Sequence, residues 1–345
     1  MKSSPTPPDL IGQSPAFLDA LTHASAVASV NRPILVVGER GSGKELLAAR
    51  IHFLSQRWDG PLVKLNCAAM NDELLESELF GHEAGAFTGA SKKHKGRFER
   101  AEGGTLFLDE IASSSQRVQE KLLRVIEYGE YERLGGEQTI KANVRIVAAA
   151  NVDLRASARQ GKFRADLLDR LAFDVVVAPP LRDRREDIPL LAAHFANNMA
   201  SELDVLFPGF EAKAMSQLST HDWPGNVREL KNTAERAMFH WSMNTKTAHI
   251  ENIVIDPFEN AGAPKEDIAD LQASDPSTTA QSETKDSTPL DLRAHLDAIE
   301  KELVSAALSK NADNQKRTAR YLSLSYDQIR GLVRKHGLAN ARQSQ

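Results

Sequence analysis

The hydrophobic pattern of the chain changes from short continuous runs in its first half to helical spacing near its end. Residues 33–37, 105–108 and 144–149 are runs dominated by Ile, Leu, Val, Phe and Ala. Runs of this length without alternation are typical of strands buried on both faces, as in a parallel sheet. The first run leads through a glycine-rich stretch into 45–52, which has the composition of a helix. We therefore predict an α/β domain.

Near the end of the chain, apolar residues recur at spacings of three and four, which predicts an amphipathic helix. The residues that form this pattern are Leu292, Leu296, Ile299, Leu303, Ala306 and Ala307. Shorter helices are expected at 315–322 and 326–335, joined by a turn through Ser323–Ser325, with Ser325 as N-cap of the second. Two helices joined in this way form a helix-turn-helix, whose second helix enters the major groove of DNA.

Charge separates these two regions. Residues 259–291 hold eight acidic and two basic side chains and no apolar periodicity, so we expect a flexible linker. The net charge of −4 says little about partners, but beyond Asn311 basic side chains outnumber acidic ones, which favours nucleic acid. The alternative is an ordinary helical hairpin with solvated charges. The expected DNA contacts are Tyr326, Gln328, Arg330 and Arg334, with Lys316, Arg317 and Lys335 nearer the phosphates.

The glycine-rich stretch after the first apolar run matches a phosphate-binding P-loop. Its residues are Gly38, Glu39, Arg40, Gly41, Ser42, Gly43 and Lys44. The predicted order of strand, loop and helix is the context that this motif requires. Backbone N–H groups would surround a phosphate, and Lys44 would contact the β- and γ-phosphates. Glu45 stands where the general motif has a Ser or Thr hydroxyl for magnesium.

Two adjacent carboxylates, Asp109 and Glu110, follow the run 105–108. Ligands of parallel sheets bind at the carboxyl ends of the strands, so both acids should face the phosphates. Asp109 would hold Mg²⁺, directly or through water, and Glu110 would activate the attacking water. Asn151, after the run 144–149, is a candidate sensor of the γ-phosphate.

Three arginines are further candidates for the nucleotide site. Arg164 and Arg170 are six residues apart in a predicted helix over 163–171, and either would serve as an arginine finger on a neighbouring subunit's ATP. The alternative is a solvated helix in which they pair with nearby aspartates. Arg228 would contact nucleotide from a small helical lid.

A stretch of six residues, most of them small, lies between the P-loop and the paired carboxylates. It consists of Gly85, Ala86, Phe87, Thr88, Gly89 and Ala90. Glycines at both ends give a pliable loop, and Phe87 and Thr88 form a tip suited to touching a partner. Alone, such a sequence is more often a tight turn.

In this order the motifs resemble the AAA+ domain of bacterial enhancer-binding proteins, the ATPase activators of sigma-54 RNA polymerase. The resemblance covers residues from about 10 to 258, and the terminal helices are similar to the Fis-type helix-turn-helix of the same family. Besides the P-loop and the six-residue stretch 85–90, the resemblance rests on four further motifs. These are Glu-Leu-Phe-Gly-His-Glu at 78–83, Leu-Phe-Leu-Asp-Glu at 106–110, Phe-Arg-Ala-Asp-Leu-Leu-Asp-Arg-Leu at 163–171 and Trp-Pro-Gly-Asn-Val-Arg-Glu-Leu at 223–230.

The resemblance implies a domain order and a set of partners. The expected order is a tail at 1–9, an AAA+ α/β core at 10–180, a helical lid at 181–258, a linker at 259–290 and a DNA-binding domain at 291–345. The implied ligands are ATP and Mg²⁺. The implied partners are sigma-54 with its RNA polymerase holoenzyme, enhancer DNA, and further copies of the chain in a homo-hexamer. A cytoplasmic, nucleoid-associated protein is expected.

The same resemblance assigns roles to residues. Phe87 and Thr88 would contact sigma-54, and a second loop at 130–137 would move with them. Asn66 would pair with Glu110 and switch it on or off. Arg164 and Arg170 would act in trans, Arg228 would be the sensor of the lid, and an acid at Glu45 is common in this family.

Regulation is expected to come from outside the chain, by a partner protein or by the level of expression, because only about a dozen residues precede the predicted core. In this respect, and in Arg-Trp-Asp-Gly-Pro at 57–61 and Phe-Pro-Gly-Phe at 207–210, the chain resembles the family members that control phage-shock and envelope-stress operons. That resemblance implies a phage shock protein A-type negative regulator, with Trp58 as a candidate docking residue. The alternative is that Trp58 closes the core beneath its loop.

The remaining composition bears on membrane insertion, cysteine chemistry and metal binding. No apolar run is long enough to span a membrane. The single cysteine, Cys67, is expected to be a small buried hydrophobe in a reducing compartment, and the ten histidines show no metal-ligand spacing.

The rival functions are a DNA-binding repressor whose ATPase fold only oligomerises, and a different AAA+ machine such as a chaperone or helicase loader. A small-molecule kinase is disfavoured because no acceptor pocket is evident.

Overall fold

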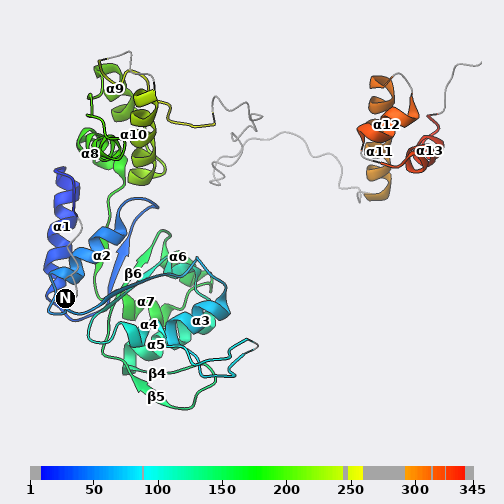
Figure 1. Cartoon of the computed structure of the whole chain (residues 1–345). Helices are drawn as coiled ribbons and strands as arrows, with labels where there is room; N and C mark the ends of the chain where they lie inside the picture. The colour runs from blue at the N-terminus through cyan, green and yellow to red at the C-terminus, as the bar shows by residue number, and fades with distance from the viewer. Residues whose placement is uncertain are drawn as a thin grey trace, which may run out of the picture. The chain divides into compact units, whose positions relative to one another are not determined.

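The computed structural model describes residues 9–87, 89–243, 248–258, 292–311, 314–322 and 324–338 (Figure 1). The chain divides into two compact units, Met1–Pro264 and Lys265–Gln345. The predicted linker at 259–290, most of the predicted tail at 1–9, and Thr88 lie outside the described residues.

The first unit is built on a parallel sheet of five strands. Their order across the sheet is β2 (Leu62–Asn66), β3 (Thr105–Asp109), β6 (Arg145–Ala150), β1 (Ile34–Val37) and β7 (Val175–Val177). The three apolar runs of the sequence are β1, β3 and β6, and they occupy the middle of the sheet. Burial on both faces is therefore why these strands lack alternation.

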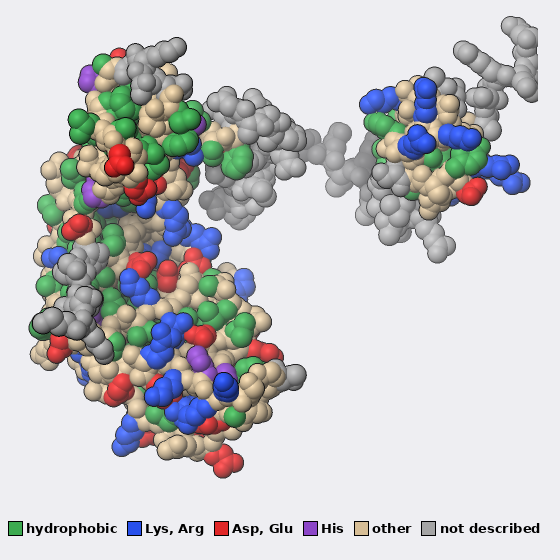
Figure 2. Space-filling view, in the orientation of Figure 1, with side chains coloured by type: hydrophobic (Ala, Val, Ile, Leu, Met, Phe, Trp, Pro, Cys, Tyr) green, Lys and Arg blue, Asp and Glu red, His purple; other side chains and the backbone are tan. Residues whose placement is uncertain are grey.

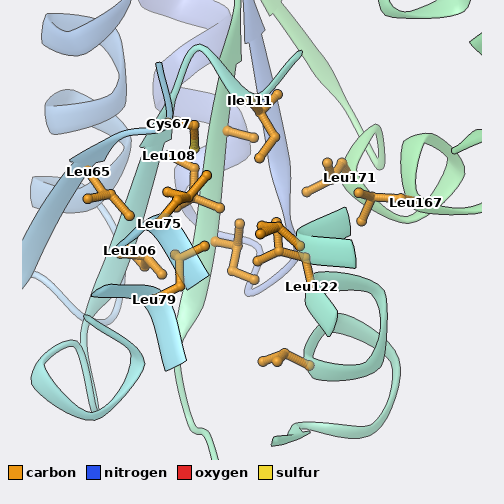
Figure 3. Close-up of a cluster of buried hydrophobic side chains, with 14 of the residues drawn as sticks. Leu65, Cys67, Leu75, Leu79, Leu106, Leu108, Ile111, Leu122, Leu167 and Leu171 are labelled. Carbon is orange, nitrogen blue, oxygen red and sulfur yellow. The ribbon is translucent and has the colours of Figure 1, made fainter. Parts of the chain in front are cut away.

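Successive residues of the central strands belong to two different hydrophobic layers. In β3, Leu106 and Leu108 lie in the larger cluster, drawn in Figure 3, whereas Phe107 lies in the smaller cluster on the opposite face. The smaller cluster is covered by α1 (Pro15–Ala28) and α2 (Lys44–Phe53). The larger is covered by α3 (Asp72–Phe80), α4 (Arg97–Arg100), α5 (Gln116–Tyr128), α6 (Leu154–Arg159) and α7 (Ala165–Leu171). The result is a sheet between two helical layers.

An antiparallel hairpin, β4 (Glu130–Glu132) and β5 (Thr139–Lys141), follows α5. Short 3₁₀ turns occupy Ile111–Ser113, Leu181–Asp183 and Arg185–Asp187. The last two lead from the sheet into a small helical lid. Among the described residues, no helix is long and apolar enough to cross a membrane.

The lid consists of α8 (Ile188–Glu202), α9 (Ala212–Thr220) and α10 (Asn226–Met243) (Figure 1). Trp223 is fully buried at its centre, and the indole N–H donates to the carbonyl oxygen of Leu218 at 2.8 Å. An indole buried with its N–H satisfied contributes apolar contact without a desolvation penalty.

The segment before α1 is tied to the start of the lid by one buried carboxylate. Asp187 has no exposed surface, and it accepts hydrogen bonds from the backbone N–H of Gln13 (2.6 Å), the backbone N–H of Ser14 (2.9 Å) and the Ser14 hydroxyl (2.7 Å). Arg184, also buried, stacks over the Phe17 ring and donates to the carbonyl oxygen of Ser42. The N-terminal segment, the P-loop and the lid are thus held together at one junction.

The second unit contains α11 (Leu292–Lys310), α12 (Gln315–Tyr321) and α13 (Tyr326–Lys335). Its core is formed by Val304, Leu308, Ala319, Ile329 and Val333. The predicted cap is confirmed, since Ser325 and Gln328 form a capping box at the start of α13.

The predicted apolar stripe of α11 is partly wrong. Leu303 is 60% exposed and Ala306 is also exposed, whereas Val304, Ala307 and Leu308 face the core. The side chains of Leu292, Leu296 and Ile299 lie outside the described residues. The observed stripe and the predicted one both have helical spacing, so the sequence pattern alone does not tell which of them faces the core.

Replacing Asp187 by Ala is expected to destabilise the first unit by about 2–3 kcal/mol, because three donors, two of them buried, lose their acceptor. The melting temperature of the full chain should fall by about 5–10 °C in differential scanning calorimetry. Asp19→Ala, at an exposed position of α1, is the matched control and should change it little. Equal melting temperatures for the two variants would contradict this role of Asp187.

Candidate nucleotide-binding site and contact loop

The P-loop connects the carboxyl end of β1 to the start of α2, as the sequence predicts. Gly41 has a φ of 74°, in the left-handed region that favours glycine. A Cβ atom added there would overlap the carbonyl oxygen of Gly225, which belongs to the lid. The backbone N–H of Val227 donates to the carbonyl oxygen of Gly41 at 3.0 Å. The lid therefore lies directly against the loop.

Lys44 is buried at the first position of α2. Its ammonium donates to the carbonyl oxygens of Gly38 and Glu39, both at 2.9 Å. Burial lowers the pKa of Lys44, while the charges of Asp109 and Glu110 oppose that shift. The ammonium is thus held at the loop by neutral oxygens, which a phosphate would replace with stronger, charge-assisted bonds.

The paired carboxylates lie at the carboxyl end of β3, at the same edge of the sheet as the P-loop. Burial raises the pKa of Asp109, and the charge of Lys44 acts in the opposite direction. Asp109 accepts a hydrogen bond from the backbone N–H of Glu110 at 2.9 Å. Glu110 has left-handed backbone angles (φ 51°, ψ 45°), and such strain in a non-glycine residue is concentrated at functional sites.

The charge partner of Glu110 differs from the one that the family resemblance implies. Arg40 of the P-loop lies 3.1 Å from the Glu110 carboxylate. Asn66 lies opposite Asp109 in the register of β2 and β3, and its side-chain oxygen accepts from the backbone N–H of Ala68 at 2.8 Å. Asn66 is therefore at the correct edge of the sheet, but here the Glu110 carboxylate is held by Arg40.

Two other predicted residues lie around the loop. Glu45 forms an ion pair with Lys64 of β2 at 2.7 Å, both side chains being largely exposed. Asn151 follows β6 and is half-buried. The residue before it, Ala150, accepts a hydrogen bond from the backbone N–H of Gly38, so Asn151 is adjacent to the base of the P-loop.

A clamp between the P-loop and the lid was missed by the sequence analysis. The guanidinium of Arg182 donates two hydrogen bonds to the Glu39 carboxylate, at 2.6 and 2.9 Å. The buried amide of Asn226 donates to Glu39 and to the carbonyl oxygen of Arg40, both at 3.0 Å, and accepts from the backbone N–H of Leu181 at 2.7 Å. Hydrogen bonds from Arg182 and Asn226 lower the pKa of Glu39 to about 2.

The sequence held one signal for this clamp. Asn226 follows Pro224-Gly225 at the start of a predicted helix, and a left-handed φ of 55° there is tolerated best by glycine and asparagine. Arg182 carries no such signal, because its partner is 143 residues away. The clamp places Arg228, near the start of α10, beside Gly41, and its charge lowers the pKa of Lys44.

The two candidate finger arginines lie at opposite ends of α7. The predicted helix over 163–171 begins at Ala165, so Arg164 is its N-cap. The direction of the Arg164 side chain relative to Arg170 is therefore not set by the helical repeat. Arg164 donates two hydrogen bonds to the Asp166 carboxylate, at 2.6 and 3.0 Å. This pairing with a nearby aspartate is the one expected in the alternative of a solvated helix. Arg170 is largely exposed and pairs with Glu127 of α5 at 2.9 Å, not with Asp169.

The six residues 85–90, hereafter the contact loop, lie between α3 and α4 in the chain. The backbone N–H of Gly85 donates to the carbonyl oxygen of Ala90 at 2.7 Å, which closes its base. Added Cβ atoms at Gly85 and Gly89 would meet nothing within 4 Å. Phe87 is 38% exposed and packs in a T-shaped arrangement with the His82 ring, with the ring centroids 4.9 Å apart. Thr88 lies outside the described residues.

The stem of the contact loop is joined to the predicted second loop at 130–137. Arg133 donates to Glu83 of the stem at 2.8 Å and to Glu99 of α4 at 2.9 Å. The backbone N–H of Glu83 also donates to the carbonyl oxygen of Leu134 at 3.0 Å. Hydrogen bonds to Glu99 and Glu83 raise the pKa of Arg133. The two loops thus share a network of charge-assisted bonds.

Two predictions concern single residues away from these loops. Trp58 is 58% exposed, so the alternative in which it closes the core is wrong. Cys67 is buried as a free thiol, and burial raises its pKa to about 12, which confirms that it packs as a small hydrophobe. Among the described residues, no group of three or more His, Cys, Asp or Glu side chains could hold a metal ion without help from a ligand.

The candidate DNA-binding side chains lie on the surface of the second unit. Figure 2 shows Lys and Arg side chains gathered on the face of this unit that is in view. Tyr326, Arg330 and Arg334 of α13 are exposed. Gln328 is exposed too, but its side-chain oxygen accepts from the backbone N–H of Ser325. Lys335 pairs with Glu300 of α11 at 2.6 Å. Lys316 and Arg317 are exposed on α12.

Comparisons with known proteins agree with this geometry. Residues 10–176 match the family model of the sigma-54 interaction domain, and residues 182–256 match that of the AAA+ ATPase lid domain. The chain is 53% identical over 329 residues to the Psp operon transcriptional activator of Escherichia coli (strain K12), which covers 95% of this chain and 98% of the relative. It is 43% identical to the transcriptional regulatory protein ZraR of the same strain, over 92% of this chain and 66% of the relative.

Solved structures extend the comparison to the fold. The crystal structure of NtrX from Brucella abortus in complex with ATP is 32% identical, with a TM-score of 0.67, over 95% of this chain and 70% of that protein. Its complex with ADP gives a TM-score of 0.65 at the same identity. The resemblance inferred from the motifs is confirmed, and the chain belongs to the sigma-54-dependent transcriptional activators, with an AAA+ α/β core and helical lid.

Proposed function

We propose that the chain hydrolyses ATP in an oligomeric ring and uses the free energy to convert the closed complex of sigma-54 RNA polymerase into an open complex. The observation that carries this proposal is the linkage through Arg133. It joins the stem of the contact loop to the hairpin that follows α5, and α5 in turn follows the paired carboxylates in the chain. A conformational change at the phosphate site would then be transmitted to the contact loop.

The residues at the sheet edge suit ATP and Mg²⁺. Lys44 already makes hydrogen bonds to oxygens at the P-loop, and the half-buried Asp109 supplies a hard oxygen ligand next to it. Bound Mg²⁺ would supply charge neutralisation on the phosphates. Ionised Asp109 would gain a cationic partner there, which offsets the burial that raises its pKa. Asn151 would donate to the γ-phosphate, and Arg228 would contact the phosphates from the lid.

Hydrolysis would depend on freeing Glu110. In the described arrangement Arg40 holds the Glu110 carboxylate in an ion pair, so the carboxylate oxygens are turned to the guanidinium and not to an attacking water. Asn66 lies at the end of the neighbouring strand, within the edge that a released Glu110 would face. We propose that exchange of Glu110 between Arg40 and Asn66 sets whether the site hydrolyses ATP.

The finger arginines require a second copy of the chain. Arg170 is 59% exposed and is paired with the surface carboxylate of Glu127, so it can be delivered to a neighbour without disrupting the core. Arg164, as an N-cap outside α7, would reach the same neighbour from a different direction. A closed ring places each ATP against the next subunit's arginines, and a hexamer is the proposed stoichiometry.

The remaining partners follow from exposed surfaces. The basic surface of α12 and α13 would anchor the ring at enhancer DNA and raise its local concentration near the promoter. The relative that controls the Psp operon supports a role in phage-shock or envelope-stress control, with a phage shock protein A-type regulator docking on exposed Trp58. Such an activator would work at the bacterial nucleoid, in the cytoplasm.

The experiment that tests this function separates hydrolysis from promoter opening. Thr88→Ala should keep ATP hydrolysis within about twofold, because it leaves the P-loop and the paired carboxylates unchanged, but should reduce open-complex formation at least tenfold. Open complexes are measured by permanganate footprinting of a sigma-54 promoter with purified polymerase, with and without ATP. Ser91→Ala, just beyond the loop, is the matched control.

Three outcomes discriminate among functions. Opening by the wild type that needs ATP and is lost in Thr88→Ala supports the activator. Hydrolysis without opening by the wild type, with polymerase and promoter controls active, assigns the loop to another client, as for a chaperone. DNA binding without hydrolysis would favour a repressor whose ATPase fold only oligomerises.

The trans arrangement predicts complementation between two inactive variants. Lys44→Ala should lose ATP binding, and Arg170→Ala should lose about 10³-fold or more in hydrolysis. In an equimolar mixture, about a quarter of the interfaces pair an intact site with an intact finger, so activity should return to about that fraction of the wild type if sites act independently. Arg155→Ala, an exposed arginine of α6, is the control. Mixed rings that stay inactive would exclude Arg170 as the trans finger.

A further inference from the structure

A polar cavity lies at the edge of the sheet opposite to the nucleotide site. It has a volume of about 190 Å³ and opens between the end of α1, the turn after α2 and the start of β6. Its lining consists of Ala28, Ser29, Asn31, Ser55, Gln56, Arg57, Asn143 and Arg145. Two arginines are the only charged side chains in this lining, so the cavity carries positive charge without an acid to balance it.

Arg145 is the inner wall of the cavity. It is 3% exposed and donates to the carbonyl oxygens of Val27 and Ala28, both at 2.8 Å. These neutral oxygens end α1, and the partial negative charge of the helix end offsets part of the arginine's charge. The Nε atom of Arg145 is buried and has no hydrogen-bond partner among the described residues. Such a group is costly unless a partner satisfies it.

Arg57 forms the outer wall, and its hydrogen bonds also go to neutral oxygens. Its Nε donates to the Asn31 side chain at 3.0 Å, and its terminal nitrogens donate to the carbonyl and side-chain oxygens of Asn143 at 2.9 and 2.7 Å. Burial and the neighbouring charge of Arg57 lower the pKa of Arg145 to about 10. Two guanidinium groups therefore share one small space.

The surface beside the cavity is apolar. Trp58, the residue after Arg57, is 58% exposed; Leu54, before the turn, is 50% exposed; and Val30, beside the lining residue Ser29, is 38% exposed. Trp and Arg are among the residue types enriched at the energetic centres of protein interfaces. Two acids lie at the periphery, since Asp59 follows Trp58 and Glu102 accepts from the backbone N–H of Asn143. They would repel an extended polyanion such as nucleic acid.

We propose that the cavity receives a single carboxylate from the protein that docks on Trp58. This inference rests on the proposed regulator site and specifies its chemistry, namely an apolar surface for Trp58 and Leu54 and an Asp or Glu side chain for the arginine pair. The carboxylate would complete the hydrogen bonding of Arg57 and Arg145 and neutralise their shared charge. A binding partner would thereby gain affinity at a site that is separate from ATP hydrolysis.

The first test uses small probes on the full chain with ¹⁵N-labelled arginine. N-acetylglutamate should shift the Nε–Hε resonance of Arg145 in a saturable way, at millimolar concentrations, whereas the uncharged N-acetylglutamine should not. Arg57→Gln should abolish that shift. Equal shifts with both probes, no saturation, or a response to inorganic phosphate alone would overturn the proposal.

The second test uses a purified phage shock protein A-type regulator. Arg57→Gln should weaken its binding at least tenfold, while ATP hydrolysis and promoter opening stay within about twofold and the melting temperature is unchanged. Arg57→Lys, which keeps the charge, should recover part of the affinity, and Arg155→Gln should have no effect. Normal regulator binding by Arg57→Gln would overturn the proposal.

Failure of the regulator assignment has a different signature. If the wild type opens promoters but never binds the regulator, the proposed partner is wrong, and the N-acetylglutamate titration alone then decides whether the cavity takes a carboxylate.

Discussion

The parallel register of β1, β3 and β6 is the constraint on which the rest of the site depends. Because all three strands run in the same direction, their carboxyl ends deliver the P-loop, Asp109 with Glu110, and Asn151 to one edge of the sheet. The alternation of buried side chains between two helical layers fixes that register, since a one-residue slip would exchange the layers. Chemistry at the edge is thus set by packing in the interior.

Two charged networks tie together the elements around the nucleotide site and the contact loop. The clamp of Arg182 and Asn226 on Glu39 ties the P-loop to the lid, and its strongly lowered carboxylate pKa keeps Glu39 ionised throughout the neutral range. The network of Arg133 with Glu83 and Glu99 ties the contact loop to the hairpin. Each is made of few bonds, and the Arg182–Glu39 pair and Glu83 are partly exposed, although Asn226 is buried. Alternative pairings of exposed ion pairs differ little in free energy. Such networks are suited to switching.

Local patterns in the sequence predicted much of this arrangement. Apolar runs located three central strands, the P-loop motif located the phosphate site, and Ser325 was correctly assigned as a cap. Long-range partners could not be predicted, because the Glu39–Arg182 pair joins residues 143 positions apart. The register of α11 was wrong by one residue at Leu303, since two neighbouring stripes both have helical spacing. The partner of Glu110 was also missed, because an arginine within the P-loop motif was assigned to nucleotide.

The most direct test of the account is whether the state of the nucleotide controls the contact loop. The affinity of the full chain for purified sigma-54 is measured by fluorescence anisotropy in three states: with no nucleotide, with ADP, and with ATP bound to Glu110→Gln, which should hold ATP without hydrolysing it. If the nucleotide controls the loop, the affinity should be at least tenfold higher in the ATP state than in the other two. Equal affinities in all three states would contradict it.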